Sequence, residues 1–420
     1  MVEGAPNLAP NSSAEYGPVA AKDRIECLDI LRGLALLMIL AANMPAFNSP
    51  LYYLEDAGQP WWSSRADHIA DALVDTFVQT ESVALFSFLF GLGFAMQLMR
   101  ANSSGLSFLS LYARRLLALI AIGAIHAYLI WMGDILILYG VLGFFLLLFR
   151  NLKAATILLL AVVLYLVPPA RWELSLVREM TVRNSASAPN NSSDEKALRA
   201  QEEARRQVAS SIQAYGHGNW LEITGQRARD YAYYVAHNQA LTIFPMFLFG
   251  LYAGRRRIFE RLDVYLRWFR RALGWSAAIA LPTVFLLRVL YLPGMPAWTV
   301  LLRPALFAIE HASLIAFYIC AVTVLQHSSR MKRVTAPLAA AGRLALSNYI
   351  FQSVICTFIF YSYGLRLYGR VGPLAGLALT LAIFATQVLL SVVWSWHFRL
   401  GPIEWLWRTI TYGRSQPMRA

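Results

Sequence analysis

Charged residues and cysteines are both scarce in this sequence of 420 residues. Only 15% of the residues are Asp, Glu, Lys or Arg, whereas soluble domains carry roughly 25%. The three cysteines, Cys27, Cys320 and Cys356, lie in or beside apolar segments and form no CxxC pair. This placement predicts small buried thiols and argues against a disulfide framework or a cysteine metal site.

Several catalytic and cofactor motifs are also missing. The sequence contains no Gly-rich phosphate loop, no HExxH helix, no GxSxG turn and no cysteine–histidine metal pattern. We therefore expect no metal site and no tightly bound cofactor. The formal charge of +13 does not indicate nucleic-acid binding, because the basic residues alternate with apolar stretches and form no single patch.

Long apolar runs take the place of these features. Hydrophobic residues make up 58% of the chain, and apolar runs of about 20 residues are typical of transmembrane helices. The pattern predicts an all-α polytopic integral membrane helix bundle with about ten transmembrane helices. We expect Pro45 to end the first helix, and Pro168 with Pro169 to end the fifth. The expected spans are residues 27–43, 69–99, 111–131, 135–149, 154–167, 238–254, 273–290, 300–325, 338–361 and 372–396.

Polar stretches and basic loops organise the chain. With Lys22 and Arg24 in the cytoplasm, ten spans place every short basic loop on the same side, as the positive-inside rule requires. Both termini are then cytoplasmic, in a bacterial inner (plasma) membrane. Residues 258–271 alternate apolar and basic side chains, which predicts an interfacial amphipathic helix. The expected regions are a disordered cytoplasmic tail (1–26), an N-terminal membrane half (27–168), a polar extracytoplasmic insert (169–236), a C-terminal membrane half (237–413) and a short tail (414–420).

Two groups of ionisable residues near the start of the chain are candidate sites. Asp29 and Arg32 share a helix face at the beginning of the first span. They predict either a structural salt bridge or a binding site for the phosphates of an anionic donor. His68 precedes Asp71 and Asp75, which are four residues apart. A histidine oriented by a carboxylate is the general base that acyl transfer needs, although ordinary polar residues at a membrane boundary give the same pattern.

Further histidines lie in the third and eighth spans. His126 is within about two turns of the hairpin residue Asp134, which predicts either a base–carboxylate pair or a structural clamp. Glu310 and His311 are adjacent in the middle of a span, where ionisable residues indicate a functional site. Neighbouring helix positions point about 100° apart, so we expect both to line one polar cavity, with Arg303 neutralising Glu310.

The ninth span carries a polar stripe. Arg343 with Ser347, and Asn348 with Gln352, stand at four-residue spacing and therefore share helix faces. Such a stripe must face other helices or a wet cavity and not lipid. The pattern predicts hydrogen bonds between helices or a substrate-binding surface.

Several longer motifs carry a family resemblance. They are LDILRGLALLMILAAN, LFSFLFGLGFAMQL, HAYLIWMGDILILYGVLG, GRLALSNYIFQSVICTFIFYSYGLRLYG and GPIEWLWRTITYG. Over about residues 24–168 and 237–413 the chain resembles the YeiB-like bacterial membrane proteins, which carry the domain of unknown function 418. The LDxxRG opening also resembles the transmembrane acyltransferases that include the heparan-α-glucosaminide N-acetyltransferases. That resemblance implies acetyl-CoA as the cytoplasmic donor and an essential histidine, for which His68 is the nearest counterpart.

These observations lead to one main hypothesis and two alternatives. The main hypothesis is an inner-membrane acyltransferase, in which an acyl-CoA co-substrate enters from the cytoplasm and a histidine acts as base toward an acceptor. The first alternative is a transporter or channel whose polar path uses the same intramembrane charges. The second is a non-catalytic membrane scaffold. The expected partners are the lipid bilayer, a small-molecule acyl donor and an acceptor, with no nucleic acid.

Overall fold

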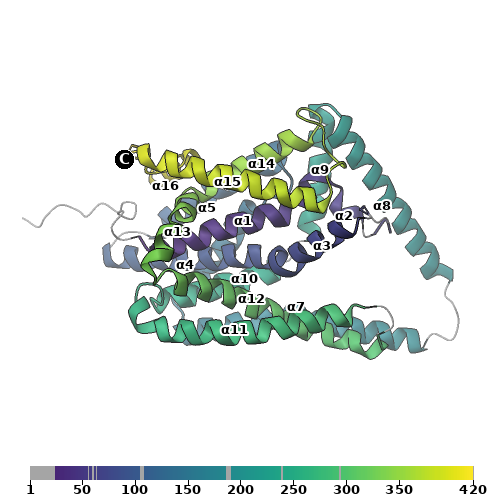
Figure 1. Ribbon diagram of the computed structural model, residues 1–420, viewed down its shortest axis with the longest axis horizontal. Helices are drawn as coiled ribbons and strands as arrows, with labels where there is room; N and C mark the ends of the chain where they lie inside the picture. The colour runs from purple at the N-terminus through teal and green to yellow at the C-terminus, as the bar shows by residue number, and fades with distance from the viewer. Residues whose placement is uncertain are drawn as a thin grey trace, which may run out of the picture.

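The protein is an all-α bundle, as the apolar pattern predicts (Figure 1). The computed structural model describes residues 24–54, 56–58, 61–62, 64–104, 108–185, 191–237, 240–292 and 295–419, so most of the expected N-terminal tail lies outside the described residues. The α-helices are α1 (Glu26–Asn48), α2 (Leu51–Leu54), α3 (Arg65–Val74), α4 (Thr80–Ser104), α5 (Phe108–Ile125), α6 (Leu136–Leu146), α7 (Ala154–Ser185), α8 (Asn191–His217), α9 (Trp220–His237), α10 (Ala240–Arg255), α11 (Leu262–Leu290), α12 (Arg303–Leu325), α13 (Ser329–Arg343), α14 (Ala345–Phe360), α15 (Pro373–His397) and α16 (Pro402–Tyr412).

Four short irregular helices lie within or next to the expected spans. A π-helical segment, Asp75–Gln79, joins α3 to α4, and a second, His126–Ile130, follows α5. A 3-10 segment, Leu147–Phe149, extends α6, and another, Ala297–Leu302, precedes α12. π-Helical turns often accompany functional sites, and both of these adjoin ionisable residues that the sequence singled out.

Seven helices of the described chain are long and apolar enough to cross a membrane, or up to eight if one bent pair counts as a span. The seven are Glu26–Asn48, Arg65–Ala101, Phe108–Ile130, Ala154–Arg178, Leu262–Leu290, Trp298–Leu325 and Pro373–His397, and the bent pair is Ser329–Arg343 with Ala345–Phe360. The protein is therefore a multi-pass membrane protein. The total of about ten spans stays a prediction.

Helix α1 lies at the centre of the bundle, in contact with α4, α13, α14 and α15 (Figure 1). Small residues allow the helices around it to approach closely. The sequence motif Gly91-xxx-Ala95 predicts such packing, and an ideal Cβ at Gly91 would lie only 1.9 Å from the carbonyl oxygen of Phe247 on α10. Any side chain at residue 91 would therefore separate α4 from α10.

The expected ninth span is broken into two helices. Helices α13 and α14 meet at Leu344 with a bend of 77°. The carboxylate of Glu404 accepts hydrogen bonds from the backbone N–H groups of Leu346 (2.7 Å) and Ser347 (3.1 Å), which have no partner within a first helical turn. Because Glu404 satisfies them, the chain can start a new helix here. The expectation that Arg343 and Ser347 share one helix face is therefore wrong.

Three expected helix boundaries are also wrong. Helix α1 continues past Pro45 to Asn48, and α7 continues past Pro168 and Pro169 to Ser185. Prolines are tolerated inside membrane helices because neighbouring groups satisfy the freed backbone atoms. No separate interfacial helix forms at residues 258–271, since residues 262–271 are the first turns of α11. Because α7 runs through residues 168 and 169, the expected boundary between the N-terminal membrane half and the polar insert falls inside this helix.

A helical cap covers one end of the bundle. Helix α8 is the long exposed helix at the right of Figure 1, and α9 packs against the turn after α5, where Arg227 donates to the carbonyl of Tyr128 (3.0 Å). Asp230 accepts hydrogen bonds from Tyr53 (2.8 Å) and Tyr215 (2.7 Å), which ties α9 to α2 and α8. We call this end of the bundle the capped end. The opposite end, where α1 begins, is called the basic end. The three cysteines are buried free thiols, as expected.

Candidate functional site

A cleft at the basic end is lined by guanidinium groups. Its outer part has a volume of about 290 Å³. Asp29 is buried, at 7% exposure, and forms an ion pair with Arg32, with 2.6 Å between the carboxylate oxygen and the guanidinium nitrogen. The expected Asp29–Arg32 pair is therefore confirmed, and it lies on the wall of this cleft. The outer part is lined by six arginines and by two carboxylates, those of Asp29 and Glu404, so it carries a strong positive charge. The arginines are Arg24, Arg32, Arg100, Arg115, Arg343 and Arg408.

The cleft continues inward as a mostly apolar pocket of about 230 Å³. The two parts adjoin, because Arg32, Arg115 and Trp407 line both of them. The guanidinium of Arg115 lies 3.9 Å from the centre of the Trp407 ring, a cation–π contact that fixes both side chains at the junction. Tyr349 also lines this pocket.

Beyond Tyr349 lies a buried histidine with two strong hydrogen bonds. The rings of Tyr349 and His126 are 5.0 Å apart between centres. His126 is fully buried; its Nδ1 is 2.8 Å from the carboxylate of Asp134, and its Nε2 is 2.8 Å from the hydroxyl of Ser353. Asp134 is held in turn by the backbone N–H of Ile137 (2.9 Å). The structure thus confirms the pairing of His126 with Asp134.

This arrangement has the order carboxylate, imidazole, hydroxyl that activates a serine nucleophile. A carboxylate on Nδ1 fixes the tautomer whose Nε2 can accept the proton of the hydroxyl. No local sequence pattern singled out Ser353, although it lies next to Gln352 in the polar stripe. Only the fold brings Ser353 to His126, because the two are 227 residues apart in the chain.

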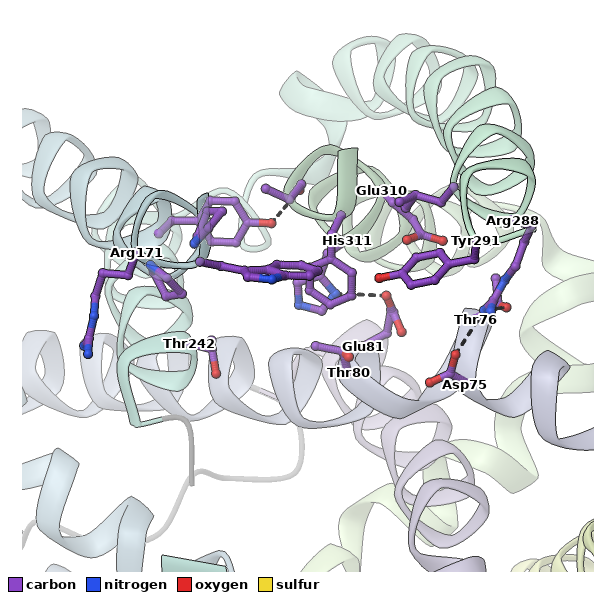
Figure 2. Close-up of a pocket in the computed structure, with 17 residues that line it drawn as sticks. Asp75, Thr76, Thr80, Glu81, Arg171, Thr242, Arg288, Tyr291, Glu310 and His311 are labelled. Atoms are coloured by element: carbon purple, nitrogen blue, oxygen red, sulfur yellow. Dashed lines mark hydrogen bonds and ion pairs between the residues drawn. The ribbon is translucent and has the colours of Figure 1, made fainter. Parts of the chain in front are cut away.

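A second and larger cavity, of about 800 Å³, opens between α4, α7, α11 and α12 (Figure 2). Glu310 and His311 both line it, as expected for neighbours that point in different directions. His311 Nδ1 lies 2.9 Å from a carboxylate oxygen of Glu81, a partner on α4 that no local sequence pattern indicates. Figure 2 shows the dashed contact between these two side chains.

Arginines near this cavity are engaged elsewhere. Arg303 donates to the carbonyl of Leu290 (2.7 Å) and lies 4.2 Å over the ring of Tyr291, so it does not neutralise Glu310 as expected. Arg288 forms a 3.1 Å ion pair with Asp75 at the rim. Asp75 is therefore a rim residue of this cavity, paired with Arg288.

The remaining candidates lie outside both sites. His68 and Asp71 are exposed on α3, and Asp71 lines a small pocket of about 20 Å³. Asn348 and Gln352 bond α14 to α15: Asn348 donates to Ser391 (3.0 Å) and Gln352 to Gln387 (2.9 Å). Of the two interpretations of the polar stripe, interhelical hydrogen bonding is the one that these contacts support. No group of three or more potential metal ligands occurs in the described part of the chain.

Comparison with known proteins identifies the family. The profile described as "Protein of unknown function (DUF418)" matches residues 253–414. The chain is 36% identical to the uncharacterized protein YxaH of Bacillus subtilis, covering 96% of this chain and 97% of that protein. The chain belongs to the YeiB-like DUF418 family. YeiB of Escherichia coli, also described as uncharacterized, is 32% identical over 94% of this chain and 98% of its own length. The basic cleft, the buried group Asp134–His126–Ser353 and the large cavity are thus features of a DUF418 protein.

Proposed function

We propose that this DUF418 protein is an inner-membrane acyltransferase that uses an acyl-CoA donor. The observation that carries the proposal is the single cleft that leads from six arginines at the basic end to Tyr349, which packs on His126. The arginines suit the phosphates of the donor, because guanidinium groups bind phosphate through paired hydrogen bonds. The apolar inner pocket suits the uncharged pantetheine arm that carries the thioester.

In this proposal Ser353 is the first acyl acceptor. His126 Nε2 takes the proton of the Ser353 hydroxyl while the Ser353 oxygen attacks the thioester carbonyl. Asp134 stabilises the imidazolium that forms on His126. The carbon–sulfur bond then breaks, and His126 returns the proton to the leaving thiolate. A hydroxyl or amine of the acceptor next attacks the acyl-serine ester. His126 accepts the proton of that hydroxyl or amine. The bond between the acyl carbon and the Ser353 oxygen then breaks, and His126 passes the proton to this oxygen, which restores the starting state.

The contacts favour this site over the other histidines. His311 bonds a glutamate, and no serine hydroxyl bonds it among the described residues; His68 is exposed. A transport path would have to join the basic cleft to the large cavity, whereas the two share no lining residue. In this proposal the basic cleft is the donor cleft. The predicted orientation, with the basic end in the cytoplasm, gives this donor cleft access to the cellular pool of acyl-CoA.

The test is a labelling experiment on the purified protein in lipid nanodiscs. With [¹⁴C]acetyl-CoA and no acceptor, we expect label that stays on the protein after denaturation and is released by hydroxylamine. Ser353→Ala should abolish it, and His126→Gln should slow it by about 10²–10⁴-fold, the usual contribution of a general base. Ser276→Ala is the matched control, because Ser276 is a buried serine that bonds only its own helix, at Leu273 (3.0 Å).

The outcomes separate the steps of the proposal. Label that persists in Ser353→Ala but disappears in His126→Gln would refute the acyl-serine and show that His126 activates another nucleophile of the protein. Full labelling of both variants, or no donor binding at millimolar acetyl-CoA, would refute the acyltransferase.

A further inference from the structure

The large cavity at the capped half of the bundle has an unbalanced buried charge. Glu81 and Glu310 line it at 3% and 7% exposure, and the only buried base beside them is His311. The two lining arginines, Arg171 and Arg288, are exposed, and Arg288 is already paired with Asp75. Two buried carboxylates therefore face one imidazole. Buried charges are costly unless they are paired, so the cavity is complementary to one more positive charge.

One carboxylate oxygen of this cavity has no hydrogen-bond partner among the residues that the structure describes. The Oε1 atom of Glu81 contacts His311, whereas its Oε2 atom is buried without a hydrogen bond. Figure 2 shows Glu81, Glu310 and Tyr291 directed toward the same part of the cavity. A buried carboxylate oxygen without a hydrogen bond destabilises the folded protein. A ligand that donates an N–H bond there would remove this penalty.

Aromatic rings form another part of the lining. Trp172 and Phe307 meet edge to face at 6.1 Å, and Phe307 stacks on His311 at 6.1 Å. Tyr165 is fixed by a 2.7 Å hydrogen bond from its hydroxyl to the carbonyl of Ala308. Ring faces attract cations and pack against apolar groups. The volume of about 800 Å³ falls in the usual range of small-molecule sites.

We propose that this cavity binds an organic cation: an ammonium group between Glu81 and Glu310, with its apolar body against Trp172 and Phe307. The proposal does not rest on acyl transfer, since the cavity shares no lining residue with the donor cleft. Two sources carry this chemistry, namely a free amine and the ammonium headgroup of a lipid such as phosphatidylethanolamine.

Binding is tested with three probes of nearly equal shape. The full-length protein in phosphatidylglycerol nanodiscs is titrated with 2-phenylethylammonium, neutral 2-phenylethanol and anionic phenylacetate, by calorimetry. We expect saturable binding of the ammonium and at least about tenfold weaker binding of the other two, because a charge-assisted hydrogen bond is lost. Equal affinity for the alcohol, or no saturable ammonium binding up to 10 mM, would overturn the proposal.

Matched variants locate the site. Glu81→Gln and Glu310→Gln should each weaken ammonium binding at least about tenfold, whereas Glu260→Gln removes an exposed carboxylate in a turn outside the cavity and should leave binding unchanged. Trp172→Leu, which keeps both carboxylates, should weaken binding as well, and it decides the matter if a glutamate variant does not fold. Unchanged binding in all folded cavity variants would overturn the proposal.

The lipid arm identifies the source of the ammonium. Nanodiscs of phosphatidylethanolamine replace those of phosphatidylglycerol, and the same titration is repeated. Competition by phosphatidylethanolamine supports a lipid headgroup as the occupant, and undiminished binding supports a soluble amine. Because labelling of Ser353 is a separate readout, failure of this inference and failure of the acyltransferase proposal are distinguishable.

Discussion

Replacing Gly342 by alanine tests how the donor cleft is held together. Gly342 lies where α13 crosses α1, and an ideal Cβ there would be 1.8 Å from the carbonyl oxygen of Asp29 and 2.8 Å from the backbone nitrogen of Gly33. Real Cβ atoms essentially never come within 3.0 Å of another heavy atom. Since both obstacles are backbone, no side chain can rotate away. The two helices must therefore move apart by about 1 Å or more.

Both stability and donor binding should suffer. Overpacking of this kind lowers the free energy of unfolding by about 1–3 kcal/mol, and the better helix propensity of alanine returns at most about 1 kcal/mol. Asp29, Arg32 and Arg343 flank the crossing and line the cleft. A misplacement of about 1 Å at a substrate-positioning group can reduce a rate by about 100-fold. We expect the labelling of Ser353 to slow by up to that factor.

The assay compares Gly342→Ala with Gly274→Ala. Gly274 lies inside the exposed part of α11, and a Cβ there would meet nothing within 4 Å. The control should therefore unfold as easily as the original protein or become more stable by up to about 1 kcal/mol. Unfolding in detergent and single-turnover labelling are measured on both variants. Equal behaviour of the two would show that the α1–α13 contact does not hold the cleft.

Three further predictions concern single contacts. Burial raises the pKa of Asp230, so its carboxyl group holds a proton more tightly in the folded state than in the unfolded chain. The free energy of unfolding should therefore fall as the pH rises through the raised pKa. Denaturation curves measured at several pH values should show a weaker dependence for Asp230→Asn. Tyr349→Phe removes a 3.1 Å hydrogen bond to the Gly133 carbonyl and should cost about 1 kcal/mol in detergent unfolding. Gln387→Leu leaves the amide of Gln352 without its 2.9 Å partner and should cost about 1–3 kcal/mol in the same measurement.

Local sequence spacing predicted the contacts that stay within one helix or one hairpin. Asp29 and Arg32 are three residues apart on a helix, and His126 and Asp134 belong to one tight hairpin, so short-range geometry alone brings each pair together. Apolar runs likewise predicted the all-α membrane fold, because a bilayer leaves few alternatives to helices.

Contacts between distant segments were beyond this reasoning. Ser353 reaches His126 across 227 residues and Glu81 reaches His311 across 230, and nothing in either local pattern names the partner. The break at Leu344 was missed for the same reason. The carboxylate that satisfies the first N–H groups of α14 belongs to Glu404, near the other end of the C-terminal half.

That break has a direct consequence for the proposed chemistry. A straight helix would continue the axis of α13, whereas the 77° bend sends α14 inward along a new axis. Leu346 and Tyr349 then line the apolar pocket, and Ser353, one turn beyond Tyr349, bonds His126. Glu404 touches none of the groups that would react, yet it sets the direction of the helix that carries Ser353. We therefore regard Glu404 as a positioning residue that joins the mouth of the donor cleft to the buried hydroxyl.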